Sequence, residues 1–192
     1  MSNIYAASSW RNEHQQEVVQ ALRGDGHAVY DFKNPSPGDK GFSWSEIDPN
    51  WKSWDPKTFR EGLNHPIARH GFKRDLDAMS WANAFLLILN SGLSAHFESG
   101  WSTGRSKPTC IYAPTIKEPE LMYLLAEESM PRGFLKSASP TDWFCTTLDE
   151  VLGFFRDLDG FWNVNGRKQR IHREGCNKRV SHVLPCDCGI GG

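Results

Sequence analysis

Apolar runs separated by longer amphipathic stretches predict that strands and helices alternate along most of this chain. The clearest run is Phe85–Leu89, five consecutive apolar residues followed by Asn-Ser-Gly. An unbroken run of this length is typical of a strand buried on both faces, as in a parallel sheet. Shorter runs predict four further strands, at residues 3–7, 27–32, 108–112 and 143–146.

The segments between these strands carry apolar residues three and four positions apart, which predicts helices. The helices span residues 13–23, 67–81, 95–105, 118–128 and 147–158. Ser94 is the expected N-cap of the third, and Thr147 with Glu150 forms a capping box for the last. Gly24 or Gly26 ends the first in a left-handed conformation. This alternation predicts an α/β fold, a three-layer sandwich around a five-stranded parallel sheet of the Rossmann-like (flavodoxin-like) kind.

Two segments stand outside the alternation. Residues 34–66 have no regular period and hold four aromatic residues, Phe42, Trp44, Trp51 and Trp54. A loop of this length usually serves as a lid or a binding loop. From Asn163 onward the chain is basic and glycine-rich, without an apolar period. We therefore expect one α/β domain over residues 1–160, with an aromatic lid at 34–66, and a Cys- and His-containing tail over residues 161–192.

Composition and charge narrow the classes of partner. The net charge is −1, from 22 basic and 23 acidic residues, so neither a nucleic-acid polymer nor a membrane surface is an expected partner. No apolar run approaches the roughly 20 residues of a membrane span, and the N-terminus lacks the pattern of a signal peptide. The five cysteines, an odd number, favour a reducing compartment, which predicts a cytoplasmic protein.

Glu98 is the main candidate for a catalytic group. It follows the buried strand, within the first turns of the predicted helix, and open α/β sheets bind small molecules at the carboxyl ends of their strands. A carboxylate there suits acid–base or nucleophilic chemistry. The alternative is that Glu98 only complements the positive end of the helix dipole.

The loop after the first strand is expected to face the same crevice. In it, Ser8 and Arg11 suit a phosphate or a sugar hydroxyl, and Trp10 suits stacking on a base. The alternative, compatible with binding, is that Ser9 or Asn12 caps the following helix. The loop contains neither a G-x-G-x-x-G dinucleotide fingerprint nor a Walker sequence.

Three other features have competing interpretations. Asp75, beside Lys73 and Arg74, is either functional or part of an exposed polar face. His96 lies two residues before Glu98, so the two side chains point apart on a helix, and His96 contacts substrate or a neighbouring subunit instead. Neither Cys110 nor Cys145 lies at an expected helix N-terminus, so a catalytic cysteine is not predicted.

The tail holds closely spaced cysteines and histidines in the pattern H-x3-C-x5-H-x3-C-x-C. Such a density suits a structural zinc ion, although the C-x-C spacing differs from the usual paired spacing. The alternative is a tail that binds no metal. The candidate ligands are His172, Cys176, Cys186 and Cys188.

Taken together, these segments resemble the nucleoside 2-deoxyribosyltransferase superfamily, which includes nucleoside-5′-monophosphate N-glycosidases. The resemblance runs from Asn3 to about Leu158. It rests on the order of five segments: Ile-Tyr-Ala-Ala at 4–7, Asp-Leu-Asp-Ala-Met-Ser-Trp-Ala-Asn at 75–83, Ser-Ala-His-Phe-Glu-Ser-Gly at 94–100, Glu-Leu-Met-Tyr at 120–123 and Thr-Leu-Asp-Glu at 147–150.

The resemblance implies roles for individual residues. Glu98 matches the family's nucleophilic carboxylate, which attacks the anomeric carbon of a (deoxy)ribosyl group and releases the nucleobase. Asp75 and Tyr5 match positions that assist the reaction. Two positions depart from the transferase pattern, Gly92 and Asn83, where an Asp is usual. Ser91, Gly92 and Ser94 instead suit a 5′-phosphate at a helix N-terminus, as in the monophosphate hydrolases.

The sequence thus predicts an enzyme that cleaves the N-glycosidic bond of a nucleoside or nucleoside 5′-monophosphate, with transfer to water or to another base. No cofactor is expected for catalysis, and the resemblance implies a homodimer or larger homo-oligomer. Two alternatives remain: a nucleotide-sensing module without turnover, and a glycohydrolase of NAD or a related nucleotide. The expected substrate-binding residues are Ser8, Trp10, Arg11, Phe32, Trp44, Trp51, Ser91, Gly92, Ser94 and His96.

Overall fold

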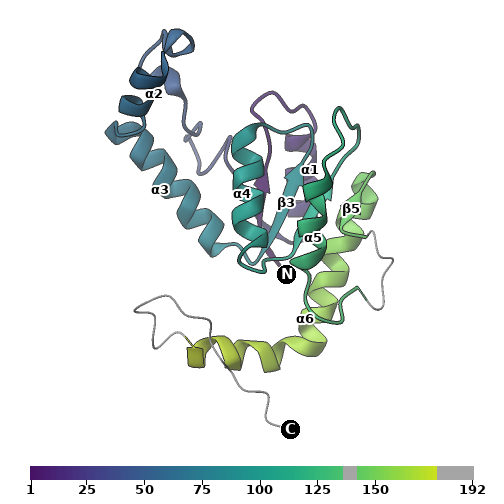
Figure 1. Ribbon diagram of the computed structural model, residues 1–192. Helices are drawn as coiled ribbons and strands as arrows, with labels where there is room; N and C mark the ends of the chain where they lie inside the picture. Colours follow the sequence, from purple (N-terminus) through teal and green to yellow (C-terminus); the bar gives the residue numbers. More distant parts are fainter. Residues whose placement is uncertain (136–141, 177–192) are drawn as a thin grey trace.

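The structure, a computed structural model, describes residues 1–135 and 142–176, with side chains up to residue 165 (Figure 1). Its centre is a five-stranded parallel sheet in the order β2-β1-β3-β4-β5. The strands are β1 (Asn3–Ala7), β2 (Ala28–Asp31), β3 (Ala84–Ile88), β4 (Thr109–Tyr112) and β5 (Phe144–Cys145). This is the flavodoxin-like order, so the predicted fold class is confirmed.

Helices cover both faces of the sheet and make three layers. On one face, α1 (Gln15–Gly24) packs against β2 and against α6 (Leu148–Cys176). On the other face, α3 (Pro66–Trp81) and α4 (Leu93–Thr103) pack against β1, while α5 (Leu125–Glu128) packs against β4. All five residues of β3 are buried, as an unbroken apolar run between two helical layers requires.

Most helix boundaries agree with the sequence pattern, and the differences have local causes. The capping box before α6 is present: the Glu150 amide donates to Thr147 Oγ1 (3.2 Å), and the Thr147 amide donates to Glu150 Oε2 (3.2 Å). Gly26 takes the left-handed conformation after α1, with φ +91°. The N-cap of α4 is Gly92 and not Ser94, so this helix begins two residues earlier than predicted.

Two predicted helices also change in extent. Residues 118–128 form a 3-10 helix, η3 (Leu121–Leu124), followed directly by the short α5. Helix α6 continues past the predicted end at Leu158 and past residue 160, so the backbone stays helical to Cys176. None of the described helices combines the length and apolar character that crossing a membrane needs.

Residues 34–66 are more regular than predicted. They contain two 3-10 helices, η1 (Trp44–Glu46) and η2 (Trp51–Ser53), and the helix α2 (Pro56–Gly62). These elements are fixed by caps and not by an apolar period: Ser43 and Glu46 make a capping box, and Asp55 accepts the Thr58 amide (2.7 Å) ahead of Pro56. Sequence periodicity therefore missed them.

We call residues 42–65 the aromatic arm. Figure 1 shows α2 and the start of α3 projecting away from the sheet. The arm has its own small core, in which Trp44 packs against three rings, with centroid distances of 4.9 Å to Phe42, 5.7 Å to Trp54 and 5.4 Å to Phe59. Phe42 also lies against Gly71 of α3, which joins the arm to that helix.

Candidate active site

Three aromatic rings form a row across the sheet on the face covered by α3 and α4. Tyr30, Tyr5 and Phe85 are register partners on β2, β1 and β3. Partners on neighbouring parallel strands point to the same face, so their rings stack. The centroids are 5.3 Å apart for Tyr30 and Tyr5, and 4.7 Å apart for Tyr5 and Phe85, with interplanar angles of 18° and 19°. We call this set the ring row.

Asp75 lies above the ring row, on α3. The Tyr30 hydroxyl donates to Asp75 Oδ1 at 2.6 Å, and Arg74 Nε lies 3.9 Å from the same oxygen. Arg74 also donates from Nη1 to Asp39 Oδ2 at 2.6 Å, which ties the chain just before the aromatic arm to α3. Asp75 is therefore held by named partners and is not part of a freely exposed polar face.

Glu98 lies beside Tyr5, on the flank of α4 that faces β1. Its carboxyl is largely removed from water, and this burial together with the charge of Asp75 raises its pKa from 4.5 to about 8. The Tyr5 hydroxyl donates a hydrogen bond to Glu98, which favours the ionised carboxylate and partly opposes that rise of the pKa. Burial also raises the pKa of Asp75, whereas the hydrogen bond from Tyr30 lowers it.

Glu98, Asp75 and Tyr5, the three predicted catalytic residues, thus lie together next to the boundary between β1 and β3. In a parallel sheet of this order, successive strands are added toward one edge before this boundary and toward the other edge after it, and ligands bind in the crevice that this switch leaves at the carboxyl ends of the strands. Two carboxyl groups of raised pKa at this place form a candidate active site.

The loop after β1 and the loop after β3 are joined by hydrogen bonds, as the strand-end argument predicted. Asn12 Nδ2 donates to the carbonyl oxygens of Ile88 (3.2 Å) and Asn90 (3.3 Å). The Ser8 hydroxyl donates to the Ile88 carbonyl (3.0 Å), so this group already has a protein partner. Asn12 Oδ1 also accepts the His14 amide (2.9 Å), which means that Asn12 supports the approach to α1 as well.

Trp10 and Phe32 meet at the rim of the same edge. Their rings pack edge to face with centroids 5.3 Å apart, and half of Trp10 remains exposed. Gly41 lies directly against both: a Cβ at this position would be 2.3 Å from the Phe32 carbonyl oxygen and 2.9 Å from the Trp10 ring. Arg11, next in the loop, is exposed.

The N-terminus of α4 lies at the same edge. Gly92 is its N-cap, so no side chain caps the first amides of the helix. Ser91 is half-buried and Ser94 is exposed in the first turn. An anion would find backbone donors and two hydroxyl groups here.

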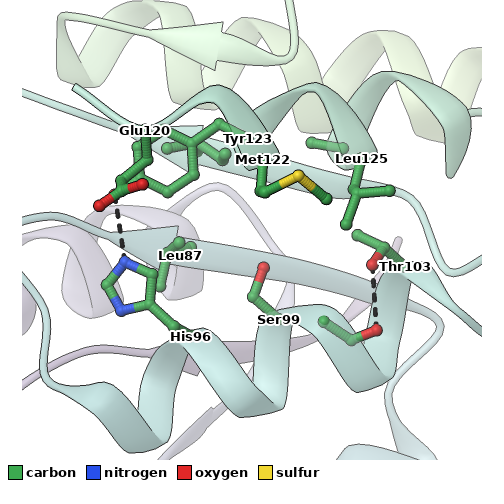
Figure 2. A pocket seen from close by; sticks show the side chains of 11 residues that line it. Leu87, His96, Ser99, Thr103, Glu120, Met122, Tyr123 and Leu125 are labelled. Carbon is green, nitrogen blue, oxygen red and sulfur yellow. Dashed lines mark hydrogen bonds between the residues drawn. The ribbon is translucent and has the colours of Figure 1, made fainter.

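His96 lies on a different flank of α4 from Glu98. Its Nδ1 donates to the Gly92 carbonyl (3.0 Å), which leaves Nε2 to accept from the Tyr123 hydroxyl (3.1 Å). The expected separation of His96 and Glu98 is therefore present. His96 contributes instead to an apolar slot of about 150 Å³ between α4 and the η3–α5 segment, which Figure 2 shows with Ser99, Met122 and Leu125 on its walls.

The structure does not bring Trp44 and Trp51 to the strand ends. Trp44 is the centre of the arm's own core, and the Trp51 ring lies against the Lys52 ammonium group (5.9 Å to the ring centroid). The ends of β1, β2 and β3 carry Ser8, Trp10, Phe32 and Ser91 instead. The substrate-binding roles of all these residues stay predictions.

The zinc site predicted for the tail lies outside the described side chains. His172 and Cys176 belong to α6 beyond residue 165, and Cys186 and Cys188 lie beyond residue 176. Among the residues that the structure does describe, no group of three His, Cys, Asp or Glu side chains is arranged to hold a metal ion. Cys110 and Cys145 are buried with their sulfur atoms 3.5 Å apart, and burial raises the pKa of Cys110.

Sequence reasoning missed Tyr30. It lies in a predicted strand, and only the pairing of β1 with β2 reveals that it stands beside Tyr5. A sequence signal existed, since each of the two strands contains a tyrosine, but the register was not known.

Comparisons with known proteins complete these observations. The structure is similar to that of a 2-deoxyribosyltransferase from the psychrotolerant bacterium Bacillus psychrosaccharolyticus, with 24% sequence identity, a TM-score of 0.45, and coverage of 78% of this chain and 89% of the other. A scan against models of protein families gave no match. A search of curated proteins gave none either.

Proposed function

We propose that this protein cleaves the N-glycosidic bond of a nucleoside or, in preference, a nucleoside 5′-monophosphate, with Glu98 as the nucleophile. The observation that carries the proposal is the meeting of Glu98, Asp75 and Tyr5 in one partly buried site beside the β1–β3 boundary. These are the three residues whose sequence context resembles the catalytic positions of the nucleoside 2-deoxyribosyltransferase superfamily.

In the first step, a Glu98 carboxylate oxygen bonds to the anomeric carbon as the bond from that carbon to the base nitrogen breaks. The base leaves with the electron pair and takes a proton, for which Asp75 is the nearby acid. A buried carboxylate stabilises the oxocarbenium-like transition state and forms a covalent glycosyl intermediate, as in retaining glycosidases. The Tyr5 hydroxyl donates to the ionised Glu98 and favours the reactive form.

In the second step, water or another base attacks the anomeric carbon and releases Glu98, and Asp75 accepts the proton of the attacking group. Two successive displacements retain the configuration of the sugar. Charge stabilisation and proton transfer suffice for both steps, so no cofactor enters the scheme.

The preference for a 5′-monophosphate comes from the edge of the sheet. The uncapped N-terminus of α4, with Ser91, Gly92 and Ser94, offers donors to a phosphate, and the exposed Arg11 supplies positive charge nearby in the neighbouring loop. Trp10 and Phe32 provide aromatic surface for the base. In this proposal Trp44 and Trp51 contribute only if the aromatic arm moves or reaches a neighbouring subunit.

A homo-oligomer belongs to the same proposal. Four large apolar side chains on α4 and η3 are more than 60% exposed, and an exposed apolar patch is typical of a protein–protein interface. They are Leu93, Phe97, Leu121 and Met122. Sedimentation velocity of the purified chain would report the oligomeric state, and a monomer at micromolar concentration would contradict this part.

Dinucleotide cleavage is less well supported. In dinucleotide-binding sheets an acidic residue near the end of β2 holds a ribose hydroxyl. Here Asp31 occupies that place, and both its oxygens already accept hydrogen bonds from protein, Oδ1 from Gln15 (2.7 Å) and Oδ2 from Gln16 (2.9 Å) and Asn34 (3.0 Å). We therefore favour a mononucleotide over NAD.

The test is base release, separated by chromatography. Wild type, Glu98→Ala and the control Glu13→Ala, an exposed glutamate before α1, would each be incubated with nucleosides, nucleoside 5′-monophosphates and NAD. We expect release from a monophosphate by wild type and the control, and a loss of at least about a thousandfold in Glu98→Ala. Binding without release by wild type would overturn the nucleophile and favour the sensing module.

A further inference from the structure

Tyr30 is the residue that connects the ring row to the second carboxyl group. Its hydroxyl lies 2.6 Å from Asp75 Oδ1, and its ring stacks on Tyr5, whose own hydroxyl reaches Glu98. Each of the two stacked tyrosines thus donates a hydrogen bond to one of the two carboxyl groups.

We propose that Tyr30 is a positioning residue that holds the Asp75 carboxyl group in the orientation from which it exchanges a proton with the departing base. The catalytic part of this inference rests on the proposed function. The hydrogen bond and its effect on Asp75 do not, and can be tested without a substrate.

The geometry explains why such a residue is needed. An aspartate side chain on a helix can adopt several rotamers unless a partner selects one of them. Within the described part of the chain, its hydrogen bond from Tyr30 and its ion pair with Arg74 both involve Oδ1. Fixing one oxygen fixes the plane of the carboxyl group and leaves Oδ2 for the substrate.

The position of the Tyr30 hydroxyl is itself fixed by the sheet. The backbones of β1 and β2 pair Tyr30 with Tyr5, and the Tyr5 ring is in turn held against Phe85. A phenol stacked in this way has little rotational freedom, so it can orient a partner with a small cost in entropy.

Tyr30 also influences the charge of Asp75. Burial and the negative charge of Asp39 raise the pKa of Asp75, while the Tyr30 hydrogen bond and the Arg74 charge lower it. Among the described residues, the other titratable groups that interact with this site are Glu98 from α4, Tyr5 from β1 and Tyr30 from β2. Removing the Tyr30 hydroxyl therefore moves the titration of Asp75 to higher pH.

The matched variants are Tyr30→Phe, which keeps the stacked ring, and Tyr112→Phe, which removes the hydroxyl of a buried tyrosine on β4. Carboxyl carbons of Asp75 and Glu98 would be titrated by ¹³C NMR in the ligand-free protein. We expect the Asp75 midpoint to rise in Tyr30→Phe and to stay unchanged in Tyr112→Phe. An unchanged midpoint in Tyr30→Phe would overturn the positioning role, whatever the activity.

Kinetic measurements on the substrate that the base-release assay identifies give the second readout. We expect kcat in Tyr30→Phe to fall by about tenfold to a hundredfold with little change of KM, and the acid limb of its pH profile to move upward. In an Asp75→Asn background, Tyr30→Phe should cause no further loss. An additive loss there would show that Tyr30 acts only through packing.

A third measurement uses no change at position 30. A hydroxyl proton held between Tyr30 and Asp75 exchanges slowly with water, and we expect its resonance in wild type and its loss in Asp75→Asn. Its absence from wild type would contradict the hydrogen bond. If this resonance and the higher titration midpoint of Asp75 in Tyr30→Phe were both observed but wild type released no base, the proposed function would be wrong while the contact between Tyr30 and Asp75 would stand.

Discussion

Burial and the negative charge that Asp75 carries when ionised both raise the pKa of Glu98, and the two residues come from different helices, α3 and α4. Each helix lies on the same face of the sheet, and both carboxyl groups point toward the ring row. Two carboxyl groups that repel one another in a partly buried site prefer to share one proton over a range of pH. A site in this state holds both a base and an acid.

Glu98→Gln should stabilise the protein at alkaline pH. The folded state prefers protonated Glu98, since its pKa is raised from 4.5 to about 8. Between these pH values Glu98 ionises in the unfolded chain but stays protonated in the folded protein, so the free energy of unfolding falls as the pH rises, by up to about 1.4 kcal/mol for each pH unit. Glutamine, always neutral, removes this loss. Urea unfolding at pH 5 and pH 8 measures this change, with Glu13→Gln, at an exposed position, as the control. The same change of unfolding free energy between the two pH values in wild type and Glu98→Gln would contradict the prediction.

Tyr5→Phe should weaken catalysis while leaving the fold intact. Phenylalanine keeps the stacking with Tyr30 and Phe85 but removes the hydroxyl that donates to Glu98, so the pKa of Glu98 rises further. At neutral pH we expect base release to slow by about tenfold to a hundredfold. The same chromatographic assay checks this, and Tyr112→Phe serves as its control. A wild-type rate in Tyr5→Phe would remove Tyr5 from the mechanism.

Asn12→Ala should destabilise the edge of the sheet. The buried Asn12 amide donates to the carbonyl groups of Ile88 and Asn90, and alanine leaves these acceptors without that donor. We expect a loss of about 1 to 3 kcal/mol in the free energy of unfolding. Ser9→Ala, in the same loop, removes only an exposed contact with the Arg11 amide and should cost less than about 0.5 kcal/mol. Similar losses in both variants would argue against the connection of the two loops.

Gly41→Ala and Gly38→Ala separate backbone strain from crowding. Both glycines have positive φ, +75° and +84°, so alanine costs about 1 to 2 kcal/mol at either position. Only at Gly41 would the new Cβ meet the Phe32 carbonyl oxygen and the Trp10 ring. We expect a further loss of about 1 to 3 kcal/mol there. Thermal unfolding of the two variants gives the comparison, and equal midpoints would mean that Trp10 and Phe32 yield freely.

The strands were predictable because buried parallel strands have a simple sequence pattern. The run 3–7 matches β1 residue for residue, and the run 85–89 is displaced by one residue from β3. The aromatic arm was not predictable in this way, since its helices are short and depend on caps. The sequence signals for these short helices were the capping pair of Ser43 and Glu46 and the N-cap Asp55 before Pro56. A search for an apolar period does not detect such signals.

The candidate site was predictable only in part. The rule that ligands bind at strand ends placed Glu98 and the loop after β1 on one edge, and the structure joins the two loops there. Tyr30 depends on the pairing register of β1 and β2, which no single segment of sequence contains. The start of α4 at Leu93 depends on Gly92, whose lack of a side chain gives no capping signal.

The ring row makes the candidate active site sensitive to a change of chain length in some segments and insensitive to it in others. One residue inserted within β2 ahead of Tyr30 would turn its ring to the opposite face and withdraw the hydroxyl from Asp75. An insertion in the outer part of the aromatic arm, between η1 and α2, would leave the pairing of all the strands unchanged. A change of length in the outer arm therefore leaves the contact between Tyr30 and Asp75 in place, whereas a one-residue change within β2 ahead of Tyr30 breaks it.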